Sequence, residues 1–348
     1  MRRIDRLRAL IPETTAVYIT AYPDIFYYSG FQSADARLII SKSKAVIITD
    51  SRYIIQAKEQ APDFELYDIK NGLKGAFSLV TEYNIGYQEE HISAKSLELA
   101  KEAAENKEFL PMQREIISLR EIKEKEEIDR IRAAQRLGDE AFSYILERIE
   151  TGRRERDIAL ELEFYMRKNG ASGLSFETIV ASGARSAMPH GVASGKLIEK
   201  GDLVTLDFGC VLDGYCSDMT RTVAVGELSD KGRLIYETVK TAQKTALDAV
   251  KVGAKLSDID KAARDVITKA GFGENFGHSL GHSVGIEIHE TPCFSPKAEG
   301  FVQNGNVITV EPGIYIEGFG GVRIEDLTAV YDGRCEVLSQ STKELIIL

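Results

Sequence analysis

An internal repeat in the second half of the chain is the feature that most constrains its fold. Four residues recur at a constant offset of 101, with predicted helices around them: Gly152, Asp157, Ile158 and Gly170 reappear as Gly253, Asp258, Ile259 and Gly271. In each copy the second glycine stands where a helix would end. Ser257 and Asp260 suggest a capping box at the start of the second copy's helix. A duplicated unit of two helices and a hairpin predicts a domain with pseudo-two-fold symmetry.

The repeat continues into predicted strands at an offset of 104. Residues 204–209 (Val-Thr-Leu-Asp-Phe-Gly) correspond to residues 308–313 (Ile-Thr-Val-Glu-Pro-Gly). Each copy then returns to a second acid followed by a threonine: Asp218 with Thr220, and Glu325 with Thr328. The alternative is a chance similarity, because helix–glycine–helix patterns are common. If the repeat is real, its two acid-bearing hairpins face each other across the symmetry axis.

The first hairpin predicts two neighbouring carboxylates. Asp213 and Gly214, between apolar strands, form a strong signal for a two-residue turn. That turn places Asp207 opposite Thr220 and makes Asp218 its diagonal neighbour, about 7–8 Å away on the same face. Two carboxylates at this separation resist joint ionisation unless a cation lies between them.

The second hairpin repeats the arrangement. Glu311 and Glu325 are symmetric about Gly318, and an odd-length loop there puts both acids on one face. A solvated surface charge is the ordinary interpretation of any single acid. Here Val310 and Ile324 indicate core strands, in which an unpaired carboxylate is costly.

Four of the five histidines lie close together in the sequence, at His190, His278, His282 and His289. The spacing of His278 and His282 would fit a zinc-binding helix, but the surrounding glycines argue against a helix and no HExxH motif is present. Together with His282, the two aspartates and two glutamates suit two adjacent hard or borderline metals better than a structural zinc. Such a pair of metals activates water and stabilises a tetrahedral transition state.

The first part of the chain predicts a separate α/β domain. Short apolar runs indicate strands at residues 16–20, 37–40 and 45–49, and the polar segments near 54–60 and 94–106 indicate helices. Apolar residues between positions 121 and 150 then recur close to the helical period, which predicts one long helix. We therefore expect an N-terminal domain over residues 1–117 and a C-terminal α+β domain over residues 118–348.

Composition excludes several classes of function. The formal net charge of -10 argues against nucleic acid or an anionic membrane as partner. The four cysteines form no CxxC pair, and the apolar stretch near the N-terminus is broken by polar residues, so we expect neither a disulfide framework nor a signal peptide. These features predict a cytoplasmic protein.

At these motifs the sequence resembles the pita-bread metallopeptidases, which include methionine aminopeptidase, Xaa-Pro aminopeptidase and Xaa-Pro dipeptidase (prolidase). The resemblance covers roughly residues 118–348 and rests on the order of the acids and histidine and on the strings around them. It implies a metal ligand set of Asp207, Asp218, His282, Glu311 and Glu325, with two divalent ions, Mn or Co first and Zn or Fe also compatible. It further implies catalytic or substrate-binding roles for His190, His278, His289 and Arg323.

The N-terminal residues indicate the branch of the family. Residues 26–31 (Phe-Tyr-Tyr-Ser-Gly-Phe) and 49–53 (Thr-Asp-Ser-Arg-Tyr) look like the creatinase-like N-terminal domain of Xaa-Pro peptidases. Creatinase itself lacks the ligands. The resemblance thus implies hydrolysis of the bond preceding proline in a short proline-containing peptide, and we expect a homodimer. The alternatives are methionine aminopeptidase specificity and a non-enzymatic pita-bread binding protein. The choice between dipeptides and longer peptides depends on loops that block the site and on the group that receives the substrate carboxylate.

Overall fold

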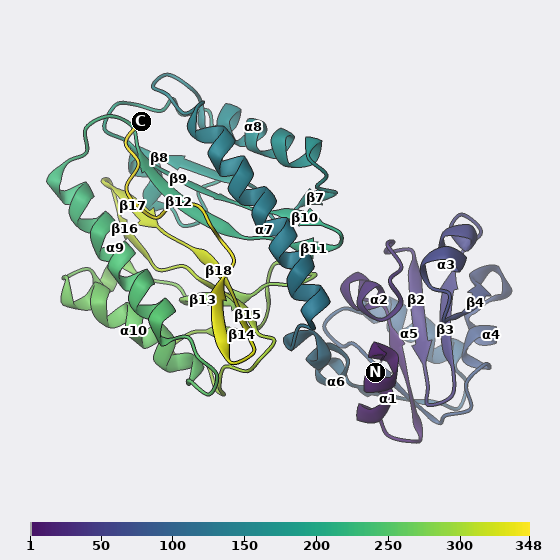
Figure 1. Cartoon of the computed structure of the whole chain (residues 1–348). Coiled ribbons are helices and arrows are strands. Elements are labelled where there is room, and N and C mark those ends of the chain that lie inside the picture. Colours follow the sequence, from purple (N-terminus) through teal and green to yellow (C-terminus); the bar gives the residue numbers. More distant parts are fainter. Residues whose placement is uncertain (1) are drawn as a thin grey trace. The chain divides into compact units, whose positions relative to one another are not determined.

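A computed structural model describes residues 2–348 of the chain. The described chain forms two compact units, the first ending at Arg120 and the second spanning Glu121–Leu348 (Figure 1). The division lies close to the expected boundary between residues 117 and 118. Within residues 2–348, no helix is both long and apolar enough to cross a membrane.

The first unit is built on a six-stranded sheet in the order β4-β3-β2-β1-β5-β6. Strand β2 runs antiparallel to β1 and β3, whereas the other pairings are parallel. The strands are β1 (Thr15–Ile19), β2 (Ala36–Ile40), β3 (Ala45–Thr49), β4 (Glu65–Asp68), β5 (Asn84–Tyr87) and β6 (Glu108–Pro111). The α-helices are α1 (Arg3–Leu10), α2 (Tyr22–Ser29), α3 (Ile54–Gln60), α4 (Leu73–Phe77), α5 (Ala94–Ala103) and α6 (Gln113–Ile117).

Apolar side chains of these strands form the core of the first unit. Tyr18, Ile39, Ile48 and Ile85 are buried from four different strands and pack with Phe77 of α4. The strands and helices predicted from apolar runs and polar segments are therefore confirmed to within a few residues. The α/β character of this unit follows from its parallel strands and connecting helices.

Four long helices organise the second unit: α7 (Lys125–Leu146), α8 (Glu155–Lys168), α9 (Asp230–Ala249) and α10 (Leu256–Lys269). Figure 1 shows α7 beside α8 on one flank and α9 beside α10 on the other. Helix α7 begins later than residue 121 because Glu124 and Glu127 form a reciprocal capping box at its start. The predicted capping box at α10 is wrong, since Lys255 precedes this helix and no side chain caps it.

Two small sheets belong to each half of the second unit. The first half holds sheets β12-β9-β8 and β11-β10-β7, and the second half holds β14-β13-β15-β18-β19 and β16-β17. The first-half strands are β7 (Gly173–Leu174), β8 (Ile179–Ser182), β9 (Leu203–Phe208), β10 (Cys210–Leu212), β11 (Tyr215–Cys216) and β12 (Met219–Ala224). The second-half strands are β13 (Gly281–Ser283), β14 (Glu290–Phe294), β15 (Val307–Val310), β16 (Gly313–Ile316), β17 (Gly320–Arg323), β18 (Asp326–Tyr331) and β19 (Arg334–Val337). Short 3₁₀ turns complete the chain at Ile69–Asn71, Ser118–Glu121, Gly183–Ala187 and Gly273–Asn275.

The two halves of the second unit repeat one design, as the sequence predicted. Helices α8 and α10 have 14 residues each, and the first and last residues of α10 follow those of α8 by 101 positions. Gly152 and Gly253 precede these helices with φ of 91° and 81°, a region that favours glycine. Each half also packs its helices on its own strands, α7 and α8 in one core and α9 and α10 in another.

Candidate active site

A cavity of about 480 Å³ within the second unit gathers the residues singled out from the sequence. All nine line its wall: Asp207, Asp218, His282, Glu311, Glu325, His190, His278, His289 and Arg323. Apolar side chains form much of the remaining wall, including Phe176, Ile179, Val192 and Ile288. The cavity therefore places a cluster of ionisable groups beside an apolar surface.

The first hairpin presents its two aspartates as predicted. Asp213 and Gly214 both have positive φ, at 49° and 81°, as a two-residue hairpin turn requires. The register pairs Asp207 directly with Thr220, which leaves Asp218 on the diagonal. Gly209 is required between them, because a Cβ there would lie 1.9 Å from the carbonyl oxygen of Ser217.

The second hairpin carries the two glutamates in the predicted register. Val310 pairs with Asp326, and Gly313 with Arg323, so Glu311 and Glu325 face each other between these pairs. The two hairpins meet at Glu325, whose Oε2 accepts a hydrogen bond of 2.7 Å from Thr220 Oγ1.

His282 lies on a strand and faces the carboxylates. Its Nε2 is 3.5 Å from Asp218 Oδ2 and 3.4 Å from Glu311 Oε1, and its Nδ1 is 3.2 Å from Ser283 O. Burial lowers the pKa of His282 to about 4, and His289 adds repulsion. A neutral ring that donates from Nδ1 to Ser283 O turns the Nε2 lone pair toward two carboxylates. This is the arrangement of a histidine prepared to bind a metal.

The carboxylates of the cluster resist ionisation together. Burial raises the pKa of Asp218 well above its ordinary range, and the charges of Glu325 and Asp207 raise it further. Burial, followed by repulsion from Glu311 and Asp207, also raises the pKa of Glu325. The pKa of Glu311 rises to about 8 through burial, which Arg323 opposes and Asp207 reinforces. Positive charge placed among these groups would relieve both effects.

The donor set fits divalent metal ions. Ligand atoms of Asp218, His282 and Glu325 lie within 4.8 Å of one another. Asp207 Oδ1 and Glu325 Oε1 are buried, and neither accepts a hydrogen bond from the described residues. Buried carboxylate oxygens without donors, next to a neutral imidazole nitrogen, match the oxygen and nitrogen ligands that Mn, Co, Zn and Fe accept.

Arg323 is buried and engaged on three sides. Its Nη2 lies 2.6 Å from Asp207 Oδ2, its Nη1 donates to Tyr315 Oη at 2.9 Å, and its Nε donates to Thr220 Oγ1 at 3.0 Å. Arg323 therefore fixes Asp207 through one carboxylate oxygen and leaves the other, Oδ1, free to bind a cation.

His278 is held by a hydrogen bond with Tyr315, a residue that was not predicted from the sequence. His278 Nε2 lies 2.9 Å from Tyr315 Oη, and its Nδ1 lies 2.8 Å from Ser279 O. Since the carbonyl oxygen of Ser279 can only accept, Nδ1 of the neutral ring carries the proton, and Tyr315 donates to His278 Nε2. The spacing in the sequence could have identified Tyr315. Glu311, Gly313 and Tyr315 are two residues apart, so an extended chain places them on the same face.

His190 and His289 differ from His278 in this respect. Neither ring has a hydrogen-bond partner within residues 2–348, and the rings of His289 and His282 lie 4.4 Å apart between centroids. Burial lowers the pKa of His289, and His190 adds repulsion. Both rings therefore line the cavity with nitrogen atoms available to a ligand.

Comparison with known proteins gives the family. Residues 129–332 match metallopeptidase family M24, and residues 3–122 match the creatinase/prolidase N-terminal domain. A Bacillus subtilis (strain 168) protein described as an uncharacterized peptidase is 41% identical over 99% of this chain and 100% of its own. The structure of Xaa-Pro dipeptidase from Bacillus anthracis is 43% identical, covers 99% of each chain and has a TM-score of 0.96. The structure of X-Pro aminopeptidase from Thermotoga maritima MSB8 is 37% identical, covers 99% of this chain and 100% of that one, and has a TM-score of 0.93.

These matches span both units of the chain and confirm the predicted fold, a creatinase-like α/β domain followed by a pita-bread domain. Membership also implies divalent metal ions and a peptide substrate. The chain belongs to metallopeptidase family M24, as a hydrolase with a creatinase/prolidase N-terminal domain.

Proposed function

We propose that this peptidase hydrolyses the bond preceding proline with the help of two divalent metal ions. The observation that carries the proposal is the convergence of two aspartates, two glutamates and His282 on one cavity beside an apolar wall. The specificity for proline is supported by the relatives, whose names describe an Xaa-Pro dipeptidase and an X-Pro aminopeptidase.

The ligands of the two ions would be Asp207, Asp218, His282, Glu311 and Glu325. Bound metal would supply Lewis-acid activation for peptide hydrolysis. Mn or Co is our first choice, and Zn and Fe are compatible with the same oxygen and nitrogen donors. Because burial and mutual repulsion raise the pKa values of Asp218, Glu311 and Glu325, metal ions and protons would compete for these carboxylates.

Two histidines are assigned to the substrate. His190 and His289 line the cavity with ring nitrogens that no described residue engages, so either can donate a hydrogen bond to a peptide oxygen. His278 instead acts as a positioning residue, because its two ring nitrogens contact Tyr315 and Ser279. Arg323 orients Asp207 through their ion pair of 2.6 Å.

The apolar wall suits a proline ring. Phe176, Ile179, Val192 and Ile288 line the same cavity as the charged cluster. A prolyl nitrogen in a peptide bond carries no hydrogen and requires no acceptor from the enzyme, and the ring fixes the local backbone. An apolar pocket beside the reacting carbonyl can therefore accept proline without leaving a donor unpaired.

The test is kcat/KM on paired peptides that differ only in proline or alanine at the second position, with Met-Ala-Xaa peptides included. We expect the proline peptides to be cleaved and their alanine counterparts to be much poorer substrates. A preference for Met-Ala-Xaa over Met-Pro-Xaa would establish methionine aminopeptidase specificity instead. No hydrolysis of any peptide by metal-loaded protein would favour a binding function.

A further inference from the structure

The charge on the cavity wall bears on which peptides the proposed site accepts. In an Xaa-Pro dipeptide, the free carboxylate belongs to the proline itself and enters the site next to the scissile bond. In a longer peptide the same carboxyl group is part of a neutral amide. A buried charge without a partner is costly. The four carboxylates of the proposed ligand set balance the charge of the two divalent ions, so the supply of further cations in the cavity separates these two substrate classes.

Arg323 is the one lysine or arginine among the described residues that line the cavity. Its guanidinium already binds Asp207 at 2.6 Å, Tyr315 at 2.9 Å and Thr220 at 3.0 Å. If Arg323 turned to a substrate carboxylate, it would give up its buried ion pair with Asp207 and its hydrogen bonds to Tyr315 and Thr220, which is unfavourable. Arg323 is therefore committed to the site itself.

The other charged side chain of the wall outside the ligand set has the wrong sign. Glu177 lines the cavity and is exposed, so its carboxylate repels a second carboxylate that enters. His278 is committed to Tyr315 and Ser279 through both ring nitrogens. Neither side chain can neutralise the terminus of a dipeptide. His190 and His289, which also line the cavity, offer ring N–H donors to peptide oxygens but no fixed positive charge.

Cys293 contributes an uncharged side chain to the cavity wall next to His282. It pairs directly with His282 across β13 and β14, it is partly buried, and it lines the cavity. Its thiol contacts Ser295 Oγ at 3.7 Å. Side chains directly opposite in an antiparallel pair have Cβ atoms about 4.5–5.5 Å apart. A longer side chain at this position would therefore reach into the cavity beside His282.

We propose that the site favours peptides in which the proline carboxyl is in amide linkage, Xaa-Pro-Yaa and longer, over free Xaa-Pro dipeptides. This proposal rests on the proposed function and adds the substrate class to it. The cavity binds the proline ring on apolar residues and offers no uncommitted lysine or arginine, within residues 2–348, to a carboxylate at that point. A neutral amide meets no such penalty.

The test uses three substrates on the metal-loaded full chain: Ala-Pro, Ala-Pro-amide and Ala-Pro-Ala. The first two differ only in the charge of the C-terminus. We expect kcat/KM for the amide and the tripeptide to exceed that for the dipeptide by about tenfold or more, which corresponds to about 1.4 kcal/mol. Equal or faster hydrolysis of the dipeptide would overturn the proposal. Cleavage of Ala-Ala-Ala but of none of the three would instead reject the proposed proline specificity.

A pair of variants then places the effect on the cavity wall. Cys293→Arg adds a cation beside His282, whereas Cys293→Met adds a neutral side chain of similar reach. We expect the ratio of kcat/KM for Ala-Pro to that for Ala-Pro-amide to rise about tenfold in the arginine variant and to stay unchanged in the methionine variant. Metal content measured on both variants checks that the ligand set is intact. An unchanged ratio in the arginine variant would contradict the role given to charge on this wall.

Discussion

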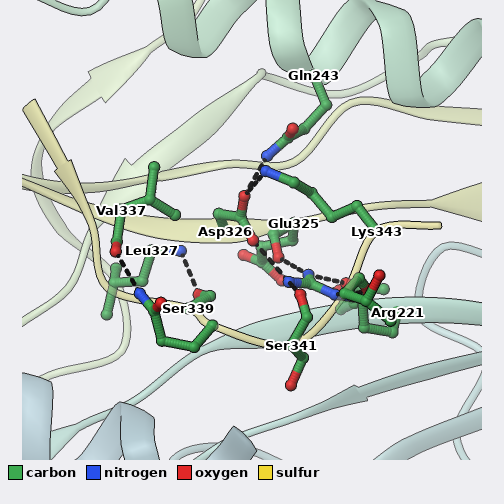
Figure 2. A network of polar contacts seen from close by, with 12 residues as sticks. Arg221, Gln243, Glu325, Asp326, Leu327, Val337, Ser339, Ser341 and Lys343 are labelled. Carbon is green, nitrogen blue, oxygen red and sulfur yellow. Dashed lines mark hydrogen bonds and ion pairs between the residues drawn. The ribbon is translucent and has the colours of Figure 1, made fainter.

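Arg221 and Asp326 form a buried ion pair that joins the two halves of the catalytic unit directly behind Glu325. Arg221 Nη2 lies 2.7 Å from Asp326 Oδ1, and Figure 2 shows the pair with Lys343 and Gln243 also directed at Asp326. The same guanidinium donates to the carbonyl oxygen of Glu325. Strands β12 and β18, which carry these two residues, are equivalent in the internal repeat. The pair therefore fixes the backbone of a predicted ligand from outside the cavity.

Arg221→Met is expected to destabilise the protein by about 3–5 kcal/mol, because it breaks a buried ion pair and removes the donor to the carbonyl oxygens of Glu325 and Ser341, while Lys343 still pairs with Asp326. Denaturant unfolding measures the loss. The matched control is Lys240→Met, which removes the surface ion pair of 2.7 Å with Glu344 and should cost less than about 1 kcal/mol. Equal losses of unfolding free energy in the two variants would show that the buried pair contributes no more to stability than the surface pair.

Asp218→Asn is expected to lose metal and hydrolysis while keeping most of the fold. The amide retains the volume of the carboxylate but supplies no negative charge to a cation beside His282, whose Nε2 is 3.5 Å from Asp218 Oδ2. Elemental analysis after dialysis measures the change. Glu177→Gln is the control, since this exposed acid lines the same cavity outside the ligand set. Unimpaired metal content in the Asp218 variant would remove that residue from the ligands.

His289→Ala is expected to retain both metals and to lower kcat by about 10²–10⁴-fold, if its ring nitrogen serves in proton transfer. Its ring lies 4.4 Å from that of His282 between centroids, and no described residue engages its nitrogens. Single-substrate kinetics with parallel metal analysis separates this effect from the loss of a ligand. A normal kcat would make His289 a structural residue.

The metal-free protein is expected to lose stability as pH rises from about 6.5 to 8. Burial raises the pKa of Glu311 to about 8 from its ordinary 4.5, so in this window the folded state holds a proton that the unfolded chain has released. His278 and His282, with pKa values lowered to about 4, are neutral in both states above their ordinary 6.5 and contribute little there. Unfolding free energies of chelated wild type and Glu311→Gln, measured across this range, check the sign. The variant should show the smaller decrease, and a wild-type free energy that rises with pH would contradict the assignment.

The sequence predicted the hairpins well because their register follows from local rules. Asp213 and Gly214 select a two-residue turn, and the alternation of side chains then determines which residues share a face. The observed pairing of Asp207 with Thr220 confirms that step. The helices of the repeat were found from the positions of the glycines that flank them, and these glycines have positive φ in the structure.

Contacts between distant segments were beyond such rules. The ion pair of Asp207 with Arg323 joins residues of the two hairpins, and strand alternation gives the face of each residue but not its partner. Asp260 shows the same limit. Instead of capping α10, it accepts hydrogen bonds from Arg264 and from the backbone of Leu280. Tertiary partners displaced the local interaction that the sequence suggested.

The most direct test of the account is the dependence of Ala-Pro-Ala hydrolysis on metal. We expect chelation to abolish hydrolysis, and added Mn²⁺ or Co²⁺ to restore it as the metal content approaches two ions per chain. This follows from the buried carboxylate oxygens of Asp207 and Glu325, which accept no hydrogen bond from the described residues, and from the neutral ring of His282 beside them. Full turnover by protein that elemental analysis shows to be free of metal would contradict the central claim.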